Sequence, residues 1–260
     1  HAAAAMLEFG KLIDQAGIPP GVVNIVTGYG DPCGRALTSH PLISKIAFTG
    51  GPIAAQQVIH NSAKNFARLT LELGGKSPVI VFDDVDIDSA VNGALGAIFG
   101  ATGQSCVAGS RLYLQQTIAD AFLEKMVKKA KQIVVGNPMD EKTQMGPLCT
   151  QGQLDHVIRE VAYAETEGGV ILCGGKQPED CYGQYFEPTI IDCPSQDMRI
   201  VDTELFGPVL SVLRFDNEAE ALQMANDTKY GLAAGVFTRD TSRALRMIDQ
   251  IRAGIIWING

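Results

Sequence analysis

Short β-branched runs alternate with helix-patterned segments along this whole sequence, and that rhythm constrains the fold more than any other feature. Runs such as KIAFT, SPVIVF and GPVLSVLRF are typical of buried strands, whereas several segments between them space their apolar residues as helices do. Strands that alternate with helices form a mostly parallel sheet with helices on both faces. The sequence therefore predicts an α/β fold with doubly wound, mostly parallel sheets.

The same pattern gives the expected elements and one boundary. A glycine pair follows the strand that ends at Leu73, and the alternation restarts after it, so we expect two domains, residues 1–73 and residues 74–260. Helices are expected over about residues 2–16, 53–64, 87–100, 118–134, 218–226 and 242–251, with a shorter one leading to residue 40. Strands are expected over residues 22–27, 45–49, 67–73, 77–82, 111–115, 168–175, 187–193, 207–215, 231–238 and 253–259.

Composition and charge exclude several classes of function. The 260 residues are 46% hydrophobic, which allows a large core, and the net charge of −8 provides no basic surface for a nucleic-acid backbone. No apolar run approaches the ~20 residues of a transmembrane helix. The six cysteines lack CxxC spacing, and the four histidines form no metal motif. We therefore expect a cytoplasmic protein with reduced thiols, no bound metal, and neither nucleic acid nor a membrane as partner.

Cys106 and Glu72 are the residues best suited to carry chemistry. Cys106 lies in GQSCVAGSR, where small neighbours leave a thiol accessible, and Glu72 lies 34 residues earlier at the end of an apolar strand. A thiolate can attack a carbonyl carbon, and a carboxylate shielded by Leu71 and Leu73 can activate water. Taken singly, each residue has a plainer interpretation: a small buried hydrophobe for the cysteine and a solvated strand end for the glutamate.

A second glycine pair marks the best candidate for a phosphate site. In AFTGG a strand leads to Gly50 and Gly51 at the start of a helix, where free N–H groups and the helix dipole favour a pyrophosphate. An ordinary strand-to-helix turn also uses glycine, so this alternative stays open. The segment GYGDPCG at residues 28–34 fits a dinucleotide fingerprint poorly, because its second interval has three residues and no acidic partner follows at the right distance.

Several motifs occur together in the order and approximate spacing of one family. With PPGVVNIVTG, AFTGG, LELGGKSP, GQSCVAGSR, ELFGPVL and AGIIWIN, the sequence resembles the NAD(P)-dependent aldehyde dehydrogenase superfamily. The resemblance implies Rossmann-like sheets, with residues 1–73 as a partial cofactor-binding domain and residues 74–260 as the catalytic domain. It also implies NAD or NADP as cofactor, an aldehyde as small-molecule substrate, and a homo-oligomer as the assembled form of the parent protein.

The resemblance assigns roles to the candidate residues. It implies that Cys106 attacks the aldehyde to give a thiohemiacetal, and that hydride transfer to the cofactor then leaves a thioester. Glu72 would activate the water that hydrolyses this thioester, and a carboxylate at this position argues against the branch of the family that passes the acyl group to coenzyme A. Lys76 is expected to be structural. The implied cofactor-binding residues are Gly50, Gly51, Leu73, Glu204 and Phe206.

Three elements that the family carries upstream do not occur in this sequence. They are the Asn that gives the second oxyanion donor, the Lys that meets the adenosine ribose, and the acidic residue that helps to select NAD over NADP. Losing one oxyanion donor costs about 100- to 1000-fold in kcat. We therefore expect this sequence to be part of a longer protein and to be nearly inactive as a dehydrogenase on its own.

Two rival functions stay open on the sequence. A thioester or ester hydrolase would use Cys106 and Glu72 without redox chemistry, and it would ignore NAD. A non-catalytic domain, retained as an interaction module, would show no unusually fast thiol at position 106. Cofactor titration tests the first alternative, and thiol labelling tests the second.

Overall fold

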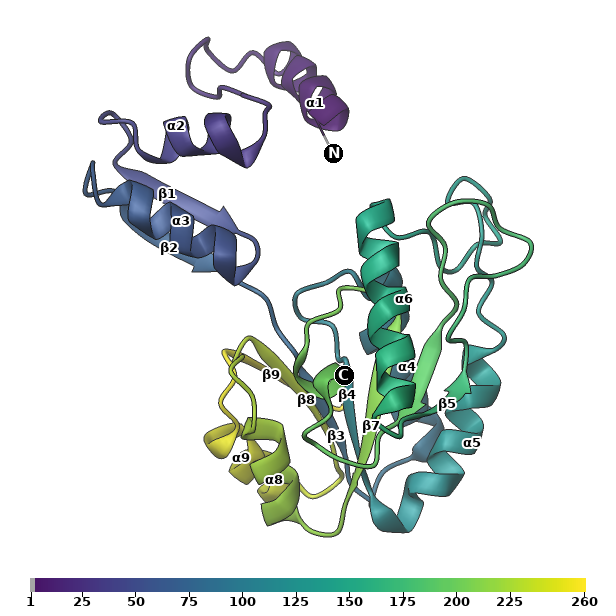
Figure 1. The fold of residues 1–260 in the computed structure, drawn as a ribbon. Coiled ribbons are helices and arrows are strands. Elements are labelled where there is room, and N and C mark those ends of the chain that lie inside the picture. The colour runs from purple at the N-terminus through teal and green to yellow at the C-terminus, as the bar shows by residue number, and fades with distance from the viewer. Residues whose placement is uncertain (1–2) are drawn as a thin grey trace. The chain divides into compact units, whose positions relative to one another are not determined.

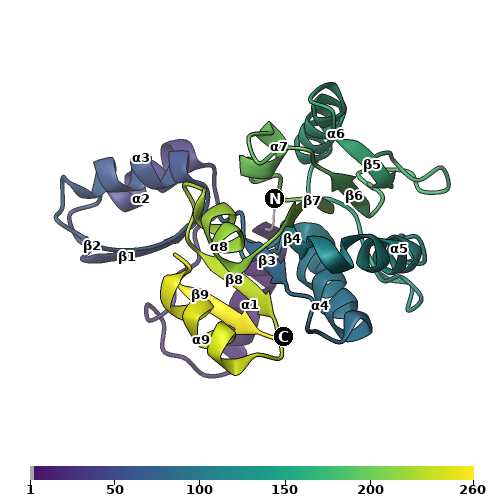
Figure 2. The same cartoon turned by 90° about the horizontal axis from the view of Figure 1, so that it is seen from below.

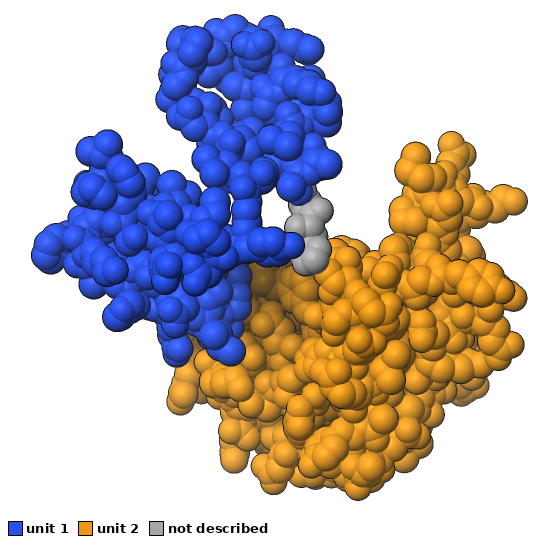
Figure 3. All heavy atoms as spheres, turned by 45° about the horizontal axis from the view of Figure 1, so that its top comes forward, with its two compact units in different colours: residues 1–73 blue, residues 74–260 orange. Residues whose placement is uncertain are grey.

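The structure is a computed structural model that describes residues 3–260 (Figure 1). The chain divides after Leu73 into two compact units, which Figure 3 shows in different colours. Unit 1 ends at Leu73, and unit 2 comprises residues 74–260. Ala2, the first residue of the predicted opening helix, lies outside the described residues.

Unit 1 contains a two-stranded parallel sheet, in which helix α3 (Pro52–Ser62) connects β1 (Lys45–Thr49) to β2 (Arg68–Glu72). This is the predicted order of strand, helix and strand. Thr49 pairs with Glu72, so both strands end at the same edge of the sheet. Earlier in the unit lie α1 (Ala3–Gln15), a π-helical turn (Gly30–Gly34) and α2 (Arg35–Thr38).

The strand predicted over residues 22–27 is wrong. These residues adopt no regular structure, and Val22, Val23 and Val26 are exposed. β-branched residues favour strands because they pack on a pleated surface beside neighbouring strands. Within residues 3–260 no strand pairs with this run, so its local preference has no surface to pack against.

Unit 2 is built on a seven-stranded sheet whose order is β5 (Val170–Cys173), β6 (Thr189–Asp192), β7 (Val209–Phe215), β4 (Arg111–Gln115), β3 (Pro78–Val81), β8 (Ala233–Phe237) and β9 (Ile255–Ile258). All neighbouring strands are parallel except β5 and β6. The predicted α/β fold with mostly parallel sheets is therefore confirmed. Strands β3 and β8 are buried along their whole length, as in sheets covered on both faces.

Helices cover both faces of this sheet and enclose two apolar cores. Helices α4 (Ile87–Phe99) and α5 (Ala119–Ala130) pack on one face (Figure 2). Helices α6 (Gln151–Thr166), α8 (Glu218–Asn226) and α9 (Thr241–Gln250), together with the short α7 (Arg199–Asp202), contribute to the core on the other. Helix α8 begins and ends where the sequence predicts, and the ends of α4 and α9 differ from the predicted ones by at most one residue.

Helix α6 is missing from the sequence-based prediction. Its buried residues Leu154, Val157 and Val161 recur at helical spacing, but polar and charged residues separate them. The signal that could have found this helix is Thr150, whose side chain accepts a hydrogen bond from the backbone N–H of Gln153 at 3.1 Å. A threonine in this position is a favoured N-cap.

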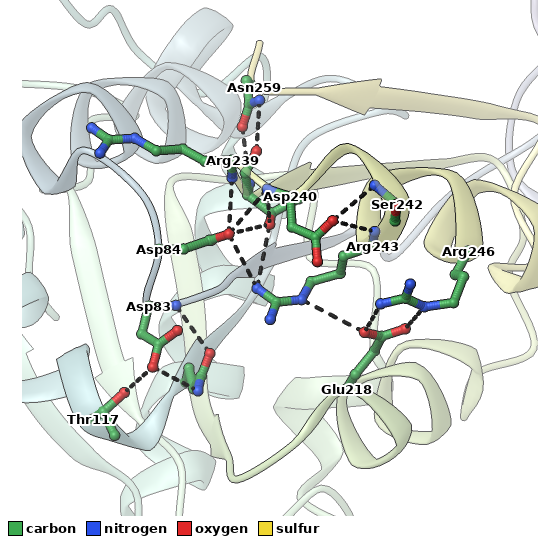
Figure 4. Close-up of polar contacts among 12 residues, drawn as sticks. Asp83, Asp84, Thr117, Glu218, Arg239, Asp240, Ser242, Arg243, Arg246 and Asn259 are labelled. Carbon is green, nitrogen blue, oxygen red and sulfur yellow. Dashed lines mark hydrogen bonds and ion pairs between the residues drawn. The ribbon is translucent and has the colours of Figure 1, made fainter.

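A polar network lies at the carboxyl ends of β3 and β8 in unit 2 (Figure 4). Asp84 Oδ2 accepts a hydrogen bond from Thr238 Oγ1 at 2.8 Å. The same oxygen accepts from the backbone N–H groups of Arg239 and Asp240, each at 3.1 Å, and lies 3.3 Å from Arg243 Nη1. We call these five residues the Asp84 network. It joins the carboxyl ends of β3 and β8 to the start of α9.

Candidate functional site

Three loops meet at the amino edge of the sheet in unit 2. Residues 74–77 precede β3, residues 100–110 connect α4 to β4, and residues 203–208 precede β7. Because β7, β4 and β3 are neighbouring parallel strands, their amino ends lie side by side. The predicted site residues Cys106, Glu204 and Phe206 all lie on these loops.

The loop that carries Cys106 begins with a left-handed turn. After α4 ends, Ala101, Thr102 and Gly103 take φ values of 50°, 60° and 67°. Such values are costly for residues with a Cβ atom, and they persist where the surrounding structure fixes an unusual chain direction. Thr102 Oγ1 donates a hydrogen bond to Gly146 O at 3.2 Å, which ties the turn to a second segment. The half-buried Cys106 follows this turn.

Gln104 fastens the Cys106 loop at a second point. Its side-chain amide donates to Pro147 O at 3.2 Å, and its Oε1 accepts from the backbone N–H of Cys149 at 2.8 Å. The residue two positions before Cys106 is therefore held by both ends of its amide group. The thiol of Cys149 itself is exposed.

Gly74 and Gly75 contact the loops of both Glu204 and Cys106. The backbone N–H of Gly75 donates to Glu204 Oε1 at 3.0 Å. A Cβ atom on Gly74 would overlap the same carboxylate, and a Cβ atom on Gly75 would overlap the backbone oxygen of Cys106. Close approach to the Cys106 backbone therefore requires glycine at position 75, whereas a side chain at position 74 would displace the Glu204 carboxylate. This pair brings the predicted nucleophile loop and a predicted cofactor residue together.

Phe206 has a strained backbone that a residue of α6 supports. Its φ is 53°, and its ring is exposed. The side-chain amide of Gln153 donates to Leu205 O and, at 3.0 Å, to Phe206 O. Next along the chain, Gly207 approaches Gly103 so closely that a Cβ atom on Gly103 would overlap its carbonyl group. Sequence reasoning missed Gln153 because it missed α6.

Buried charge lies beneath these loops. Burial, with a smaller contribution from the positive charge of Arg111, lowers the pKa of Lys76 to about 7. Burial raises the pKa of Glu204, whereas the Gly75 N–H and the charge of Lys76 act in the opposite direction. The buried Arg111 donates from Nε to Lys76 O at 2.7 Å, which fixes the backbone at the start of β3. Within residues 3–260, Lys76 Nζ has no hydrogen-bond partner.

The other predicted residues lie in unit 1, at the carboxyl edge of its sheet. The backbone N–H of Gly50 donates to Glu72 O at 3.1 Å, so the candidate phosphate turn lies beside the candidate base. Gly51 is the N-cap residue of α3, with Pro52 at the first helical position. Glu72 is exposed and Leu73 is half-buried, so the predicted shielding of the carboxylate by Leu71 and Leu73 is wrong for unit 1. The structure thus groups these residues in unit 1, and Cys106, Glu204 and Phe206 in unit 2.

Residues 3–260 contain neither a metal-ligand cluster nor a helix suited to crossing a membrane. Among residues 3–260, no group of three or more His, Cys, Asp or Glu side chains is arranged to hold a metal ion. None of the helices in the same range has the length and apolar character needed to cross a membrane.

Comparison with known proteins gives consistent matches over the chain. The sequence model described as "Aldehyde dehydrogenase family" matches residues 1–260. The chain is 53% identical to a (Z)-2-((N-methylformamido)methylene)-5-hydroxybutyrolactone dehydrogenase of Acinetobacter baylyi, covering 100% of this chain and 53% of the relative. It is 44% identical to a chloroplastic betaine aldehyde dehydrogenase of Beta vulgaris, covering 99% of this chain and 52% of the relative.

Solved structures give the same result. The crystal structure of PnpE, a protein of Pseudomonas sp. WBC-3, in complex with nicotinamide adenine dinucleotide has a TM-score of 0.96 at 45% identity, covering 98% of this chain and 53% of that chain. A betaine aldehyde dehydrogenase of Staphylococcus aureus in complex with NAD⁺ has a TM-score of 0.94 at 38% identity, covering 98% and 51%. The chain therefore spans about half the length of these proteins.

Proposed function

The chain belongs to the aldehyde dehydrogenase family, and from that membership we propose that the full-length protein oxidises an aldehyde to a carboxylic acid with NAD or NADP. The two similar structures contain a nicotinamide dinucleotide, which supports this choice of cofactor. Within this scheme, residues 1–73 form part of the cofactor-binding domain and residues 74–260 form the catalytic domain.

The contact made by Gly74 and Gly75 is the observation that carries this proposal beyond family membership. Hydride transfer requires the carbon bound to the nucleophile and the nicotinamide to lie close together. Gly75 touches the Cys106 backbone and hydrogen-bonds to Glu204, the proposed ligand of the nicotinamide ribose. This contact supports a reaction in which the nucleophile and the ligand of the nicotinamide ribose lie on adjoining loops.

Cys106 is the proposed nucleophile. Its thiolate attacks the aldehyde carbon, and the backbone N–H of Cys106 can donate to the oxyanion of the thiohemiacetal. When bound, the cofactor accepts the hydride that leaves this carbon, and a thioester to Cys106 remains. Glu72 then takes a proton from a water molecule, which attacks the thioester and releases the acid and the thiolate. Aldehyde, water and oxidised cofactor give acid, reduced cofactor and one proton.

Residues of both units fit the chemistry of a dinucleotide. Gly51 starts α3 with open space where a side chain would project, and free N–H groups at a helix N-terminus suit a pyrophosphate. Gly50 and Leu73 adjoin this turn and the end of β2. In unit 2, Glu204 offers a carboxylate to ribose hydroxyls, and Phe206 offers an exposed ring to the nicotinamide.

The test is a set of three variants of the full-length protein. Cys106→Ser should lose NAD(P)H formation by at least about a thousandfold, because the nucleophile is gone. Glu72→Gln should give a burst of about one NAD(P)H per active site and then slow turnover, because only thioester hydrolysis is impaired. Cys149→Ser, the matched control with an exposed thiol, should keep its activity within about twofold.

Other outcomes would favour the rival functions. Ester hydrolysis that needs Cys106 but ignores NAD(P) would contradict the dehydrogenase proposal and favour a hydrolase. A protein that shows neither activity, and whose Cys106 reacts no faster than its other cysteines, would favour a non-catalytic module.

Assembly and location are further parts of the proposal. We propose that the full-length protein is a homo-oligomer and that it is cytoplasmic. Six free cysteines support a reducing compartment. The Beta vulgaris relative is chloroplastic, so gel filtration and fractionation of the source cells are the measurements that decide these two points.

A further inference from the structure

A pocket of about 490 Å³ in unit 2 adjoins the Cys106 loop. Ser105 and Val107, the neighbours of Cys106 on either side, both line it. The last turn of α4 forms a second wall, and Trp257 of β9 contributes to another. This volume lies within the range of roughly 300–1,000 Å³ that is usual for small-molecule sites.

Two glycines near the carboxyl end of α4 leave this pocket open without a packing reason. Gly96 lies in the last turn of α4, Gly100 is the residue that follows the helix, and both line the pocket. A Cβ atom added at either position would meet no other atom within 4 Å. By contrast, a Cβ atom on Gly93 would lie 2.6 Å from the ring of Phe237, so that glycine is needed for packing.

Glycine within a helix has a cost that packing offsets at Gly93 but not at Gly96. An interior glycine destabilises a helix by roughly 0.5–1 kcal/mol relative to alanine. Gly96 and Gly100 are exposed and line the pocket, so a side chain would fit at either position and would take up open space at the pocket wall. Glycine at these two positions therefore leaves that space free.

The lining of the pocket indicates the chemical class of the molecule that fits it. Among the described residues, those that line the pocket include no Asp, Glu, Lys, Arg or His. Most are small and apolar, with the hydroxyls of Ser77 and Ser105 as the polar side chains and with Phe237 and Trp257 as the aromatic ones. Such a lining stabilises an uncharged apolar body and offers no countercharge to a cationic one.

We propose that Gly96 and Gly100 are specificity-determining residues, which keep this pocket open for the apolar body of a bulky, uncharged aldehyde whose carbonyl group reaches Cys106. This inference rests on the proposed function for the chemical step, and it adds the class of substrate. Small aldehydes do not need the space, and a cationic aldehyde would meet the rings of Phe237 and Trp257 but no carboxylate in this lining.

The kinetic test uses the full-length protein with Gly96→Leu and Gly100→Leu. The probes are benzaldehyde, which is bulky and uncharged, acetaldehyde, which is small, and betaine aldehyde, which is cationic. The unmodified protein should have a kcat/KM for benzaldehyde at least about tenfold above that for betaine aldehyde. Each leucine should lower kcat/KM for benzaldehyde by about 10- to 200-fold, chiefly through KM, and should change acetaldehyde oxidation by no more than about twofold.

A control variant separates specificity from stability. Ala121→Leu places the same leucine on an exposed position of α5 outside the pocket, and it should leave all three substrates unaffected. Equal losses with all aldehydes in the Gly96→Leu and Gly100→Leu variants, or a preference for betaine aldehyde, would overturn the inference.

A binding measurement distinguishes this inference from the proposed function. Benzyl alcohol, which has no carbonyl group to react with a thiol, should slow the alkylation of Cys106 by iodoacetamide in the unmodified protein and not in Gly100→Leu. Protection that is lost in this variant supports the pocket even if no aldehyde is oxidised, an outcome that would sink only the proposed function. If both proteins are alkylated at the same rate with and without benzyl alcohol, the pocket is not the binding site, whatever the enzymatic activity.

Discussion

Gln153 and Phe206 illustrate how single residues determine this site. A left-handed backbone costs a residue such as phenylalanine about 1–3 kcal/mol, so other contacts must hold it in place. The two hydrogen bonds from the Gln153 amide to Leu205 O and Phe206 O are in the right place to offset that cost. Gln153 is thus a positioning residue for the exposed ring of Phe206.

Replacing Gln153 should therefore affect cofactor binding more than the chemical step. In Gln153→Ala of the full-length protein, we expect KM for NAD(P) to rise about tenfold with kcat changed less than threefold, because the ring loses its support but Cys106 and Glu72 remain. The control is Gln223→Ala, an exposed position of α8. Steady-state kinetics at varied cofactor concentration measure the split, and an equal fall in kcat with no change in KM would contradict this role.

Lys76 gives a pH-dependent prediction. Because its folded pKa is lowered to about 7 from 10.5, the unfolded chain binds more protons than the folded one between these values. Burial of the charged amine therefore lowers the free energy of unfolding by its full amount below pH 7. This destabilisation disappears as the pH rises to 10.5. Lys76→Met should stabilise the chain at pH 6 and change its stability little at pH 10.5.

Urea unfolding of the chain at the two pH values measures this effect. The exposed Lys128→Met serves as control and should shift the unfolding midpoint by a similar small amount at both. If Lys76→Met changes the free energy of unfolding equally at pH 6 and pH 10.5, the amine is not held neutral by burial.

The loops that precede β4 and β7 contact each other closely. Gly103 has a positive φ, and its missing side chain allows contact with the carbonyl group of Gly207. Gly103→Ala should lower the free energy of unfolding by at least about 2 kcal/mol, because it adds backbone strain and an overlap with main-chain atoms that cannot rotate away. Gly152→Ala, in an open position of α6, should leave stability unchanged or raise it by up to about 1 kcal/mol. Equal effects of the two substitutions on urea unfolding would contradict the close packing of these loops.

Prediction of elements from the sequence succeeded where local pattern and tertiary packing agree. Helix α8 and strand β1 lie where the pattern places them, because their apolar spacing matches their final environment. Residues 22–27 have the composition of a strand but no neighbouring strand among the described residues. Helix α6 has a core face diluted by charge, so only its cap was a usable signal. The strand was predicted wrongly because a short stretch of sequence does not show whether a neighbouring strand exists. The helix was missed because charged residues obscure its apolar face.

At the scale of the whole molecule, the motifs were sufficient to identify the family, and that prediction is confirmed. The close approaches at Gly75 and Gly103 could not be predicted, because they join loops that lie far apart in the sequence. The sequence also did not indicate which edge of the sheet carries the candidate residues of unit 2. Ligands of open parallel sheets usually bind at the carboxyl ends of the strands, whereas the candidate residues of unit 2 lie at the amino ends. The roles of Cys106 and Glu72 stay predictions until the variants are measured.

The Asp84 network lies at the carboxyl edge of the sheet in unit 2, opposite the Cys106 loop, and it offers a position for attaching a label. Asp84 uses the backbone N–H of Arg239, and the Arg239 side chain is exposed, so exchanging that side chain leaves the hydrogen bond in place. A fluorophore or a surface tether attached there would be separated from the Cys106 loop by the length of β3 and β8. Such a label could report unfolding, or immobilise the protein, without modifying the loop that carries Cys106.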